Sequence, residues 1–185
     1  MVLDFLRSFT LSALGLLLVF SGLGYAASAL LFRAPAQTFH LRGANFTIPD
    51  GWSCEKEDTE VICGKPTSKR DALIITTTKT IGVIDTLERY REHLGTPQPI
   101  TYNDGSAGMS EVRYVRTELY GGRAWVDGMH HGSEVPNYDT RYLATVAGPT
   151  AILITFSCKA DVCESYKSLV DAFVGSLDPR DTSAL

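Results

Sequence analysis

The feature that most constrains this chain is an uncharged apolar run over residues 8–32, between Arg7 and Arg33. A membrane-spanning helix needs about 20 mostly apolar residues, whereas the apolar core of a secretory signal peptide needs only about 7–15. The length of the run therefore predicts that residues 1–33 form an uncleaved N-terminal transmembrane anchor. A cleaved signal segment is the alternative, because Ala27-Ser28-Ala29 has the small-x-small pattern of a signal-peptidase site.

The charges that flank this run do not determine its orientation in a membrane. Asp4 and Arg7 precede it, and Arg33 and Arg42 follow it, so the positive-inside rule gives no direction. Small residues four positions apart would permit homodimerisation through the span, although such spacing is common by chance. These pairs are Gly22 with Ala26 and Gly24 with Ser28.

The rest of the chain is long enough for one domain. After a tether over residues 34–37, residues 38–178 can bury about 70% of the surface that their unfolded form exposes, and residues 179–185 are expected to form a frayed tail. The chain carries 17 basic and 21 acidic residues, for a net charge of −4, with no basic cluster apart from Lys69-Arg70. Nucleic-acid binding needs a concentrated positive face, so that class of function is excluded.

The four cysteines form two pairs that are close in sequence, Cys54 with Cys63 and Cys158 with Cys163. Neither spacing matches a C-x-x-C zinc knuckle, whereas a local disulfide in each place fits a chain that leaves the cytoplasm. Together with the anchor, these disulfides predict a single-pass inner-membrane protein with a cytoplasmic N-terminus and its domain outside. Cleavage of the segment would give a secreted or periplasmic domain instead. Four buried thiols in a reducing cytosol are the alternative to the disulfides.

Runs rich in apolar and β-branched residues, separated by turn signals, predict a series of strands. They cover residues 38–42, 45–48, 52–55, 60–64, 71–80, 110–120, 123–131, 138–147 and 150–158. The last strand is apolar on both faces, which predicts a central strand that is covered on both sides. Residues 96–108 are expected to form a polar loop.

Two helices are expected in the domain, one starting near Asp85 and one near Asp161. Each of these residues is followed three positions later by a glutamate, Glu88 or Glu164, which is the spacing of a capping box. The first helix would end at Gly95 and the second near residue 177. The predicted fold class is therefore α+β, with a central antiparallel sheet flanked by helices.

The strongest candidate for a ligand or metal site is Asp127 with His131, to which a loop would add Glu134. Strand alternation places Asp127 and His131 on one face and His130 on the other. This spacing matches no established zinc signature, and polar residues at a water-exposed strand end are the simpler interpretation. No hydrolase elbow, H-E-x-x-H helix or phosphate loop is present, so we expect a protein that is not an enzyme and uses no cofactor.

Aromatic residues in and before the last four strands offer a second kind of site. Packing in the core is the simpler role for them, but several on one exposed sheet face or groove would mark a binding surface. They are Tyr102, Tyr114, Tyr120, Trp125, Tyr138 and Tyr142. The loops over residues 96–108 and 132–137 are the expected places for binding residues.

The order of elements, together with Phe46-Thr47-Ile48-Pro49-Asp50-Gly51-Trp52, resembles the PsbP/DcrB-like superfamily. The resemblance covers residues 38–178 and implies an α/β/α sandwich. Members are mainly non-enzymatic binding or assembly factors, among them a photosystem II extrinsic subunit, bacterial envelope lipoproteins and a Ran-binding import factor. This chain departs from the lipoproteins, because no lipobox cysteine follows its apolar run.

The expected function is therefore a membrane-anchored extracytoplasmic binding or assembly module that has a protein partner in the cell envelope. The alternative is an extracytoplasmic protein that binds a small ligand or metal near Asp127 and His131.

Overall fold

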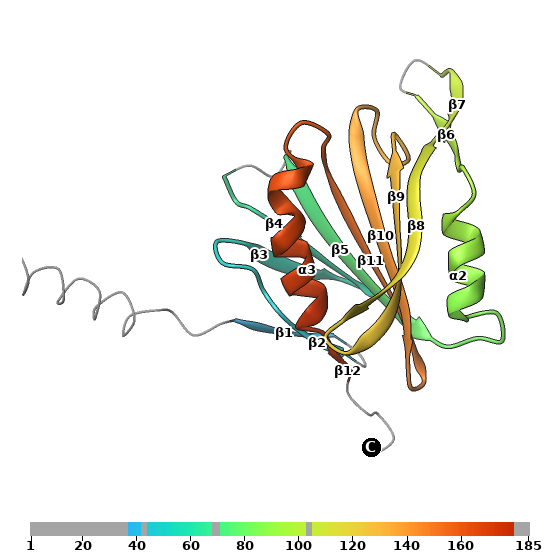
Figure 1. Cartoon of the computed structure of the whole chain (residues 1–185). Coiled ribbons are helices and arrows are strands. Elements are labelled where there is room, and N and C mark those ends of the chain that lie inside the picture. Colours follow the sequence, from blue (N-terminus) through green and yellow to red (C-terminus); the bar gives the residue numbers. More distant parts are fainter. Residues whose placement is uncertain (1–36, 42–43, 68–70, 103–104, 180–185) are drawn as a thin grey trace, which may run out of the picture. The chain divides into compact units, whose positions relative to one another are not determined.

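The computed structural model describes residues 37–41, 44–67, 71–102 and 105–179 (Figure 1). The apolar run over residues 8–32 lies outside these ranges, so the predicted anchor is not among the described elements. Within the described ranges no helix is long and apolar enough to cross a membrane.

A seven-stranded antiparallel sheet forms the centre of the domain, in the order β3-β4-β5-β11-β10-β9-β8 (Figure 1). Its strands are β3 Ser53–Glu57, β4 Glu60–Gly64, β5 Ala72–Thr80, β8 Glu111–Tyr120, β9 Arg123–His131, β10 Tyr138–Ala147 and β11 Thr150–Lys159. A three-stranded sheet consists of β1 Thr38–Leu41, β2 Ala44–Thr47 and β12 Asp178–Pro179, and a small hairpin consists of β6 Pro99–Thr101 and β7 Ala107–Met109. The helices are α2 Leu87–Leu94 and α3 Lys167–Gly175, and a 3₁₀ turn, η1 Cys163–Tyr166, precedes α3.

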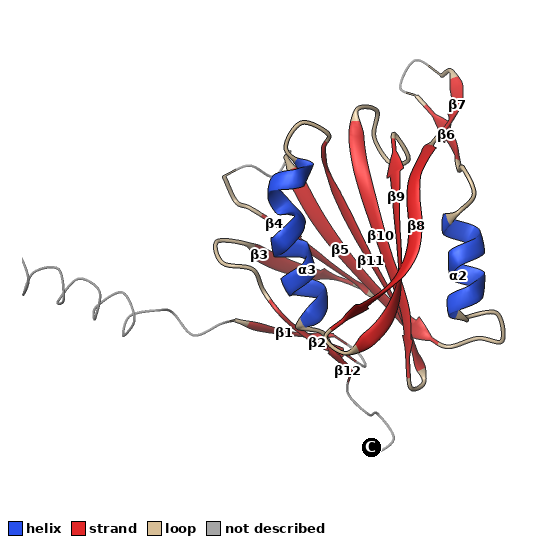
Figure 2. Ribbon diagram, viewed as in Figure 1, coloured by secondary structure: helices blue, strands red, loops and turns tan. Residues whose placement is uncertain are grey.

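Helix α3 packs on one face of the seven-stranded sheet and completes the apolar core there (Figure 2). Residues of β5 alternate strictly between buried and less buried, as the period of two in a strand requires, and Ile74 lies on the core side. The α3 residues Val170, Phe173 and Val174 are buried against the same core. Phe173 also meets Phe46 of β2 edge to face, with ring centroids 4.8 Å apart, which joins the small sheet to this layer.

Helix α2 lies on the opposite face, where it packs on β8, β9 and β10. Gly128 makes this packing possible, because a Cβ atom at that position would lie 3.1 Å from the Cβ of Leu94. The helix has eight residues and is therefore about 12 Å long, too short to extend across β11 and β5 as well. The expectation that β11 is covered on both sides is wrong for this reason, and Leu153 of β11 remains 37% exposed.

Both predicted capping boxes are wrong. Thr86 caps α2 by accepting a hydrogen bond from the backbone N–H of Arg89, at 3.2 Å, while the carboxylate of Asp85 accepts from the N–H of Gly82. Asp161 caps nothing, because the chain enters α3 through η1 and the first turn of α3 has no side-chain cap. The predicted loop over residues 96–108 contains the β6–β7 hairpin.

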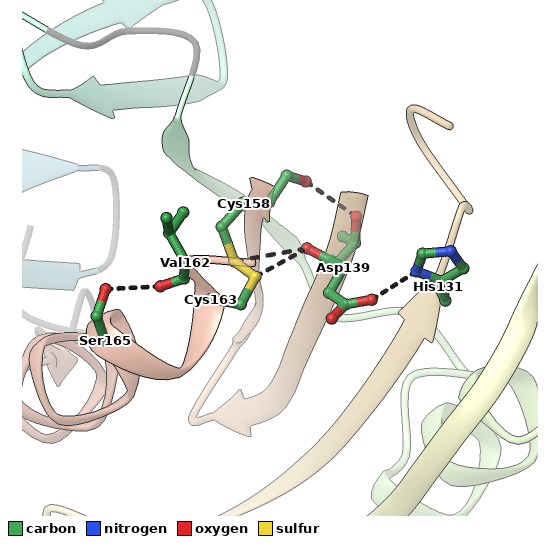
Figure 3. Close-up of a disulfide and its surroundings, with 8 residues drawn as sticks. His131, Asp139, Cys158, Val162, Cys163 and Ser165 are labelled. Carbon is green, nitrogen blue, oxygen red and sulfur yellow. Dashed lines mark hydrogen bonds and ion pairs between the residues drawn. A yellow bond between two sulfur atoms is a disulfide. The ribbon is translucent and has the colours of Figure 1, made fainter. Parts of the chain in front are cut away.

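Both predicted disulfides are confirmed. Cys54 and Cys63 face each other directly in the β3–β4 pair, with Cα atoms 4.1 Å apart, so this bond staples the hairpin. Cys158 at the end of β11 is bonded to Cys163 at the start of η1 (Figure 3). Both sulfur atoms of that bond lie 3.7 Å from the backbone carbonyl oxygen of Asp139.

Candidate binding groove

The face of the sheet opposite α3 exposes side chains of β5, β11 and β10 that α2 does not cover. These side chains belong to the less buried half of each alternating strand and are mainly aliphatic, aromatic or threonine. Two rows of directly paired residues form this floor: Thr77, Leu153 and Ala144 in one row, and Ile75, Thr155 and Tyr142 in the next.

Two adjoining cavities of about 500 and 470 Å³ open over this floor, and Thr77, Leu153 and Glu134 line both. The first cavity lies between α2 and the floor, and the second extends toward Glu60 and Tyr138. We call the two together the open-face groove. Ligand sites in proteins have volumes of about 300–1,000 Å³ and combine mainly apolar walls with a few polar groups. The open-face groove has this composition.

The wall on the α2 side carries Tyr90, His93 and Leu94. The hydroxyl of Tyr90 donates a hydrogen bond to Asp85 Oδ1 at 2.7 Å. Burial, followed by this bond to a carboxylate, raises the pKa of Tyr90 above its ordinary value. The hydroxyl therefore stays protonated at neutral pH and is fixed at the mouth of the groove.

The loop after β9 also lines the groove, and there it contacts Tyr142 of the floor. The hydroxyl of Tyr142 lies 2.6 Å from Glu134 Oε1 and 2.9 Å from Ser133 Oγ. Burial first, and then the hydrogen bond to Glu134, raise the pKa of Tyr142. This pair gives the groove a negative charge beside a fixed hydroxyl, while Lys79, which also lines the first cavity, has its charge paired with Asp85.

His130 lies under the groove and is fully buried. Its Nε2 lies 2.8 Å from the carbonyl oxygen of Leu94, and its Nδ1 lies 2.9 Å from Ser110 Oγ. A carbonyl oxygen only accepts, so Nε2 carries a proton, and Nδ1 shares a hydrogen bond with the Ser110 hydroxyl. The ring is also perpendicular to that of Tyr142. His130 therefore connects α2 and the floor and is not available to a ligand.

The three residues predicted as a ligand or metal site do not converge. Asp127 is fully buried on the α3 side of the sheet, where it pairs with Arg141. His131 Nδ1 lies 2.7 Å from Asp139 Oδ1 (Figure 3). Glu134 lies on the other face of the sheet, where it accepts a hydrogen bond from the Tyr142 hydroxyl. The described part of the chain contains no group of three or more metal-ligating residues.

The aromatic residues divide between the two faces. Trp125 is buried in the core, and Tyr114 and Tyr120 donate hydrogen bonds to Asp127. Tyr142 and Tyr138 line the open-face groove. Both loops expected to hold binding residues reach this groove, one through residues 98 and 99 and the other through residues 133–135.

Sequence reasoning missed Thr77 and Leu153, the two floor residues common to both cavities. The available signal was the apolar outer face of β11. That face predicts a surface covered by another element, but α2, which packs on β8, β9 and β10, leaves Leu153 exposed.

No protein-family model and no curated protein matches the sequence. The structure is similar to the solution structure of cyanobacterial PsbP (CyanoP) from Synechocystis sp. PCC 6803, with a TM-score of 0.56 and 14% identity over 80% of this chain and 95% of that one. It is also similar to the Ran-binding protein Mog1p of Saccharomyces cerevisiae, with a TM-score of 0.52 and 15% identity over 80% and 97% of the two chains. A protein of Bacteroides thetaiotaomicron gives a TM-score of 0.50 at 10% identity, and the match covers 80% of this chain and 50% of that one. The resemblance inferred from residues 46–52 is thus confirmed at the level of the fold.

Proposed function

We propose, starting from the PsbP/Mog1-like fold of this chain, that it is a membrane-anchored extracytoplasmic module without enzymatic activity. It binds an apolar segment of a protein partner in the cell envelope. The observation that carries this proposal is the open-face groove, in which Leu153 stays exposed at the centre of a sheet whose other face is packed by α3. A sheet face of this kind, apolar in the middle and polar at its rim, has the composition of a binding surface.

The location outside the cytoplasm is supported by the two disulfides, because such bonds persist in oxidising compartments and are rare in the cytosol. The apolar run over residues 8–32 supports the anchor by its length. The similar structures support a binding role by analogy only, since Mog1p is described as a Ran-binding protein.

Photo-cross-linking from the groove tests this function. A benzoylphenylalanine residue is placed at position 153 in the groove and, as the matched control, at the exposed position 55 on edge strand β3. After irradiation of intact cells, we expect a covalent adduct with one envelope protein from position 153 and none of that mass from position 55. The same adducts from both positions, or none from position 153, would contradict the proposal.

A second candidate function is binding of a small ligand in the first cavity. It is favoured by the polar groups of Tyr90, Tyr142 and His93, which line this cavity beside the apolar floor. Native mass spectrometry of protein purified from its own membranes distinguishes the two functions. A bound small molecule would appear as a constant added mass, and Leu153→Arg would remove it.

A further inference from the structure

The loop that joins β5 to α2 exposes an uncharged apolar tip. Val83 is 100% exposed, Ile84 is 73% exposed and Ile81 is 38% exposed. Gly82 completes this tip, so its four residues, 81–84, carry no charged side chain. Adjacent branched aliphatic residues at full exposure are costly in water, and such patches mark sites of contact with a protein or a membrane.

The loop is held rigidly in this exposed position. The buried carboxylate of Asp85 accepts a hydrogen bond from the N–H of Gly82 at 2.7 Å and pairs with Lys79 Nζ at 2.8 Å. The N–H of Ile81 donates to the carbonyl oxygen of Pro149 in the β10–β11 turn at 2.9 Å. Because its charge is neutralised by Lys79, Asp85 fixes the loop without making its tip more polar.

This loop lies at the same end of the sheet as the point where the domain begins. At that end lie the β10–β11 turn, which the loop contacts, and the β8–β9 turn (Figure 1). Gly121 of the β8–β9 turn approaches Gly175 at the end of α3. Ser176 follows Gly175, and its hydroxyl oxygen accepts a hydrogen bond from the backbone N–H of Thr47. Thr47 pairs with Thr38, the first residue of β1.

Leu119 adds a further apolar group at this end of the sheet. It lies in β8, two residues before the β8–β9 turn, and is 72% exposed.

We propose that the tip formed by Val83 and Ile84 inserts into the surface of the lipid bilayer that anchors the chain. This inference rests on the proposed function, because a retained anchor is what brings the domain to the bilayer. Five residues, 33–37, connect the apolar run to β1, and a fully extended segment of that length spans at most about 18 Å. A tether of this length keeps the start of β1 within reach of the bilayer, and the tip lies at the same end of the sheet as that start. Transfer of apolar side chains from water into the boundary between headgroups and acyl chains lowers their free energy.

Tryptophan quenching by brominated lipids tests this proposal on the full chain reconstituted into phosphatidylcholine vesicles. Both native tryptophans, Trp52 and Trp125, are buried in the domain, so brominated lipid should quench little of their emission. The test variant is Val83→Trp. The control is Met109→Trp, since Met109 is 59% exposed in β7, which lies at the opposite end of the sheet, and does not line the groove.

We expect brominated lipid to quench the added emission of Val83→Trp and to leave that of Met109→Trp unquenched. Ile84→Trp provides a second test variant if Val83→Trp does not fold. Flotation of the vesicles is measured in parallel and reports the anchor alone. If the chain floats with the vesicles but the tryptophan at position 83 or 84 is not quenched, the insertion of the tip is overturned and the anchor stands. If the chain does not float, both proposals are overturned.

Discussion

Arg141 and Asp127 form a buried ion pair across β10 and β9, with Arg141 Nε donating to Asp127 Oδ1 at 2.9 Å. Asp127 also accepts hydrogen bonds from Arg116 and from the hydroxyls of Tyr114 and Tyr120. Burial alone would raise the pKa of Asp127, but the hydrogen bonds and the charge of Arg141 outweigh it and hold that pKa below its usual value. Asp127 is therefore ionised at neutral pH, where it joins β8, β9 and β10 on the core side of the sheet.

Removal of one partner of this pair should destabilise the fold strongly. Arg141→Met leaves the buried Asp127 without its main partner, and the expected cost is about 3–5 kcal/mol in the free energy of unfolding. Urea unfolding followed by tryptophan fluorescence measures it. The control is Arg113→Met, which removes an exposed pair with Glu111 and should cost less than about 1 kcal/mol. Equal losses in the two variants would show that burial of the pair does not matter.

Asp85 should make stability depend on pH in the acidic range. Hydrogen bonds from Lys79, Tyr90 and Gly82 lower the pKa of Asp85 from 3.8 to about 2. A lowered pKa in the folded state contributes stability that is fully present above the unfolded pKa and is lost as the pH falls through the folded pKa. At pH 7 we expect Asp85→Asn to be less stable than the native chain by about 1–3 kcal/mol, the cost of losing hydrogen bonds to a charged group.

The difference between native chain and Asp85→Asn should shrink as the pH falls from about 4 to 2. Urea midpoints measured at intervals across this range check the prediction. Asp71→Asn is the control, because it removes a carboxylate whose pair with Lys159 is partly exposed. A constant difference between native chain and Asp85→Asn down to pH 2 would contradict the assignment.

Much of the fold follows from the sequence, and the misses have physical causes in tertiary contacts. Nine strands and both disulfides follow from alternation, turn residues and cysteine spacing, which all act over a few residues. The short strands β6, β7 and β12 were not predicted. The starts of the helices do not follow from the sequence. Asp85 pairs with Lys79, and Thr86 instead caps α2.

The groove could not be predicted for a related reason. Its existence depends on how far α2 reaches across the opposite face, which is a tertiary property. The predicted set of Asp127, His131 and Glu134 failed to converge because each side chain has a nearer partner.

Gly128 should be intolerant of a side chain. In Gly128→Ala the new Cβ would lie 3.1 Å from the Cβ of Leu94 and 3.3 Å from Val115 Cγ2, so α2 must shift away from β9. Overpacking of this kind costs about 1–3 kcal/mol. Gly64→Ala is the matched control, since its nearest neighbour, Leu73 Cδ1, would lie at an ordinary 3.6 Å. Thermal unfolding of both variants measures the difference, and a similar stability for the two would contradict the packing argument.

Reduction of the disulfides should lower the stability of the domain. Each bond closes a short loop, of sequence separation 9 for Cys54–Cys63 and 5 for Cys158–Cys163. Loop-closure entropy predicts a stabilisation of about 2–3 kcal/mol for each. The paired substitutions Cys54→Ser with Cys63→Ser, and Cys158→Ser with Cys163→Ser, separate the two contributions in urea unfolding. Peptide mapping without reductant, on protein from its native compartment, must find both bonds, and free thiols there would contradict the extracytoplasmic location.

The open-face groove should accept a small apolar probe that a charge at its centre excludes. A small carbene-generating diazirine is added to the full chain in vesicles, and labelled peptides are mapped by mass spectrometry, which separates groove peptides from those of the apolar run. In the native chain we expect labelling of the peptides that contain Thr77 and Leu153, because these residues line both cavities. In Leu153→Arg that labelling should fall several-fold, since a guanidinium group in the groove keeps its water and displaces the probe.

Stability should change by less than about 1 kcal/mol in Leu153→Arg, because residue 153 is already partly exposed and has room for a longer side chain. Leu119→Arg is the matched control: it adds the same charge at an exposed leucine of edge strand β8 that does not line the groove. This control should leave the labelling of the groove peptides unchanged. If Leu119→Arg reduces that labelling as much as Leu153→Arg does, the probe reports net charge and the groove is not the site of apolar binding.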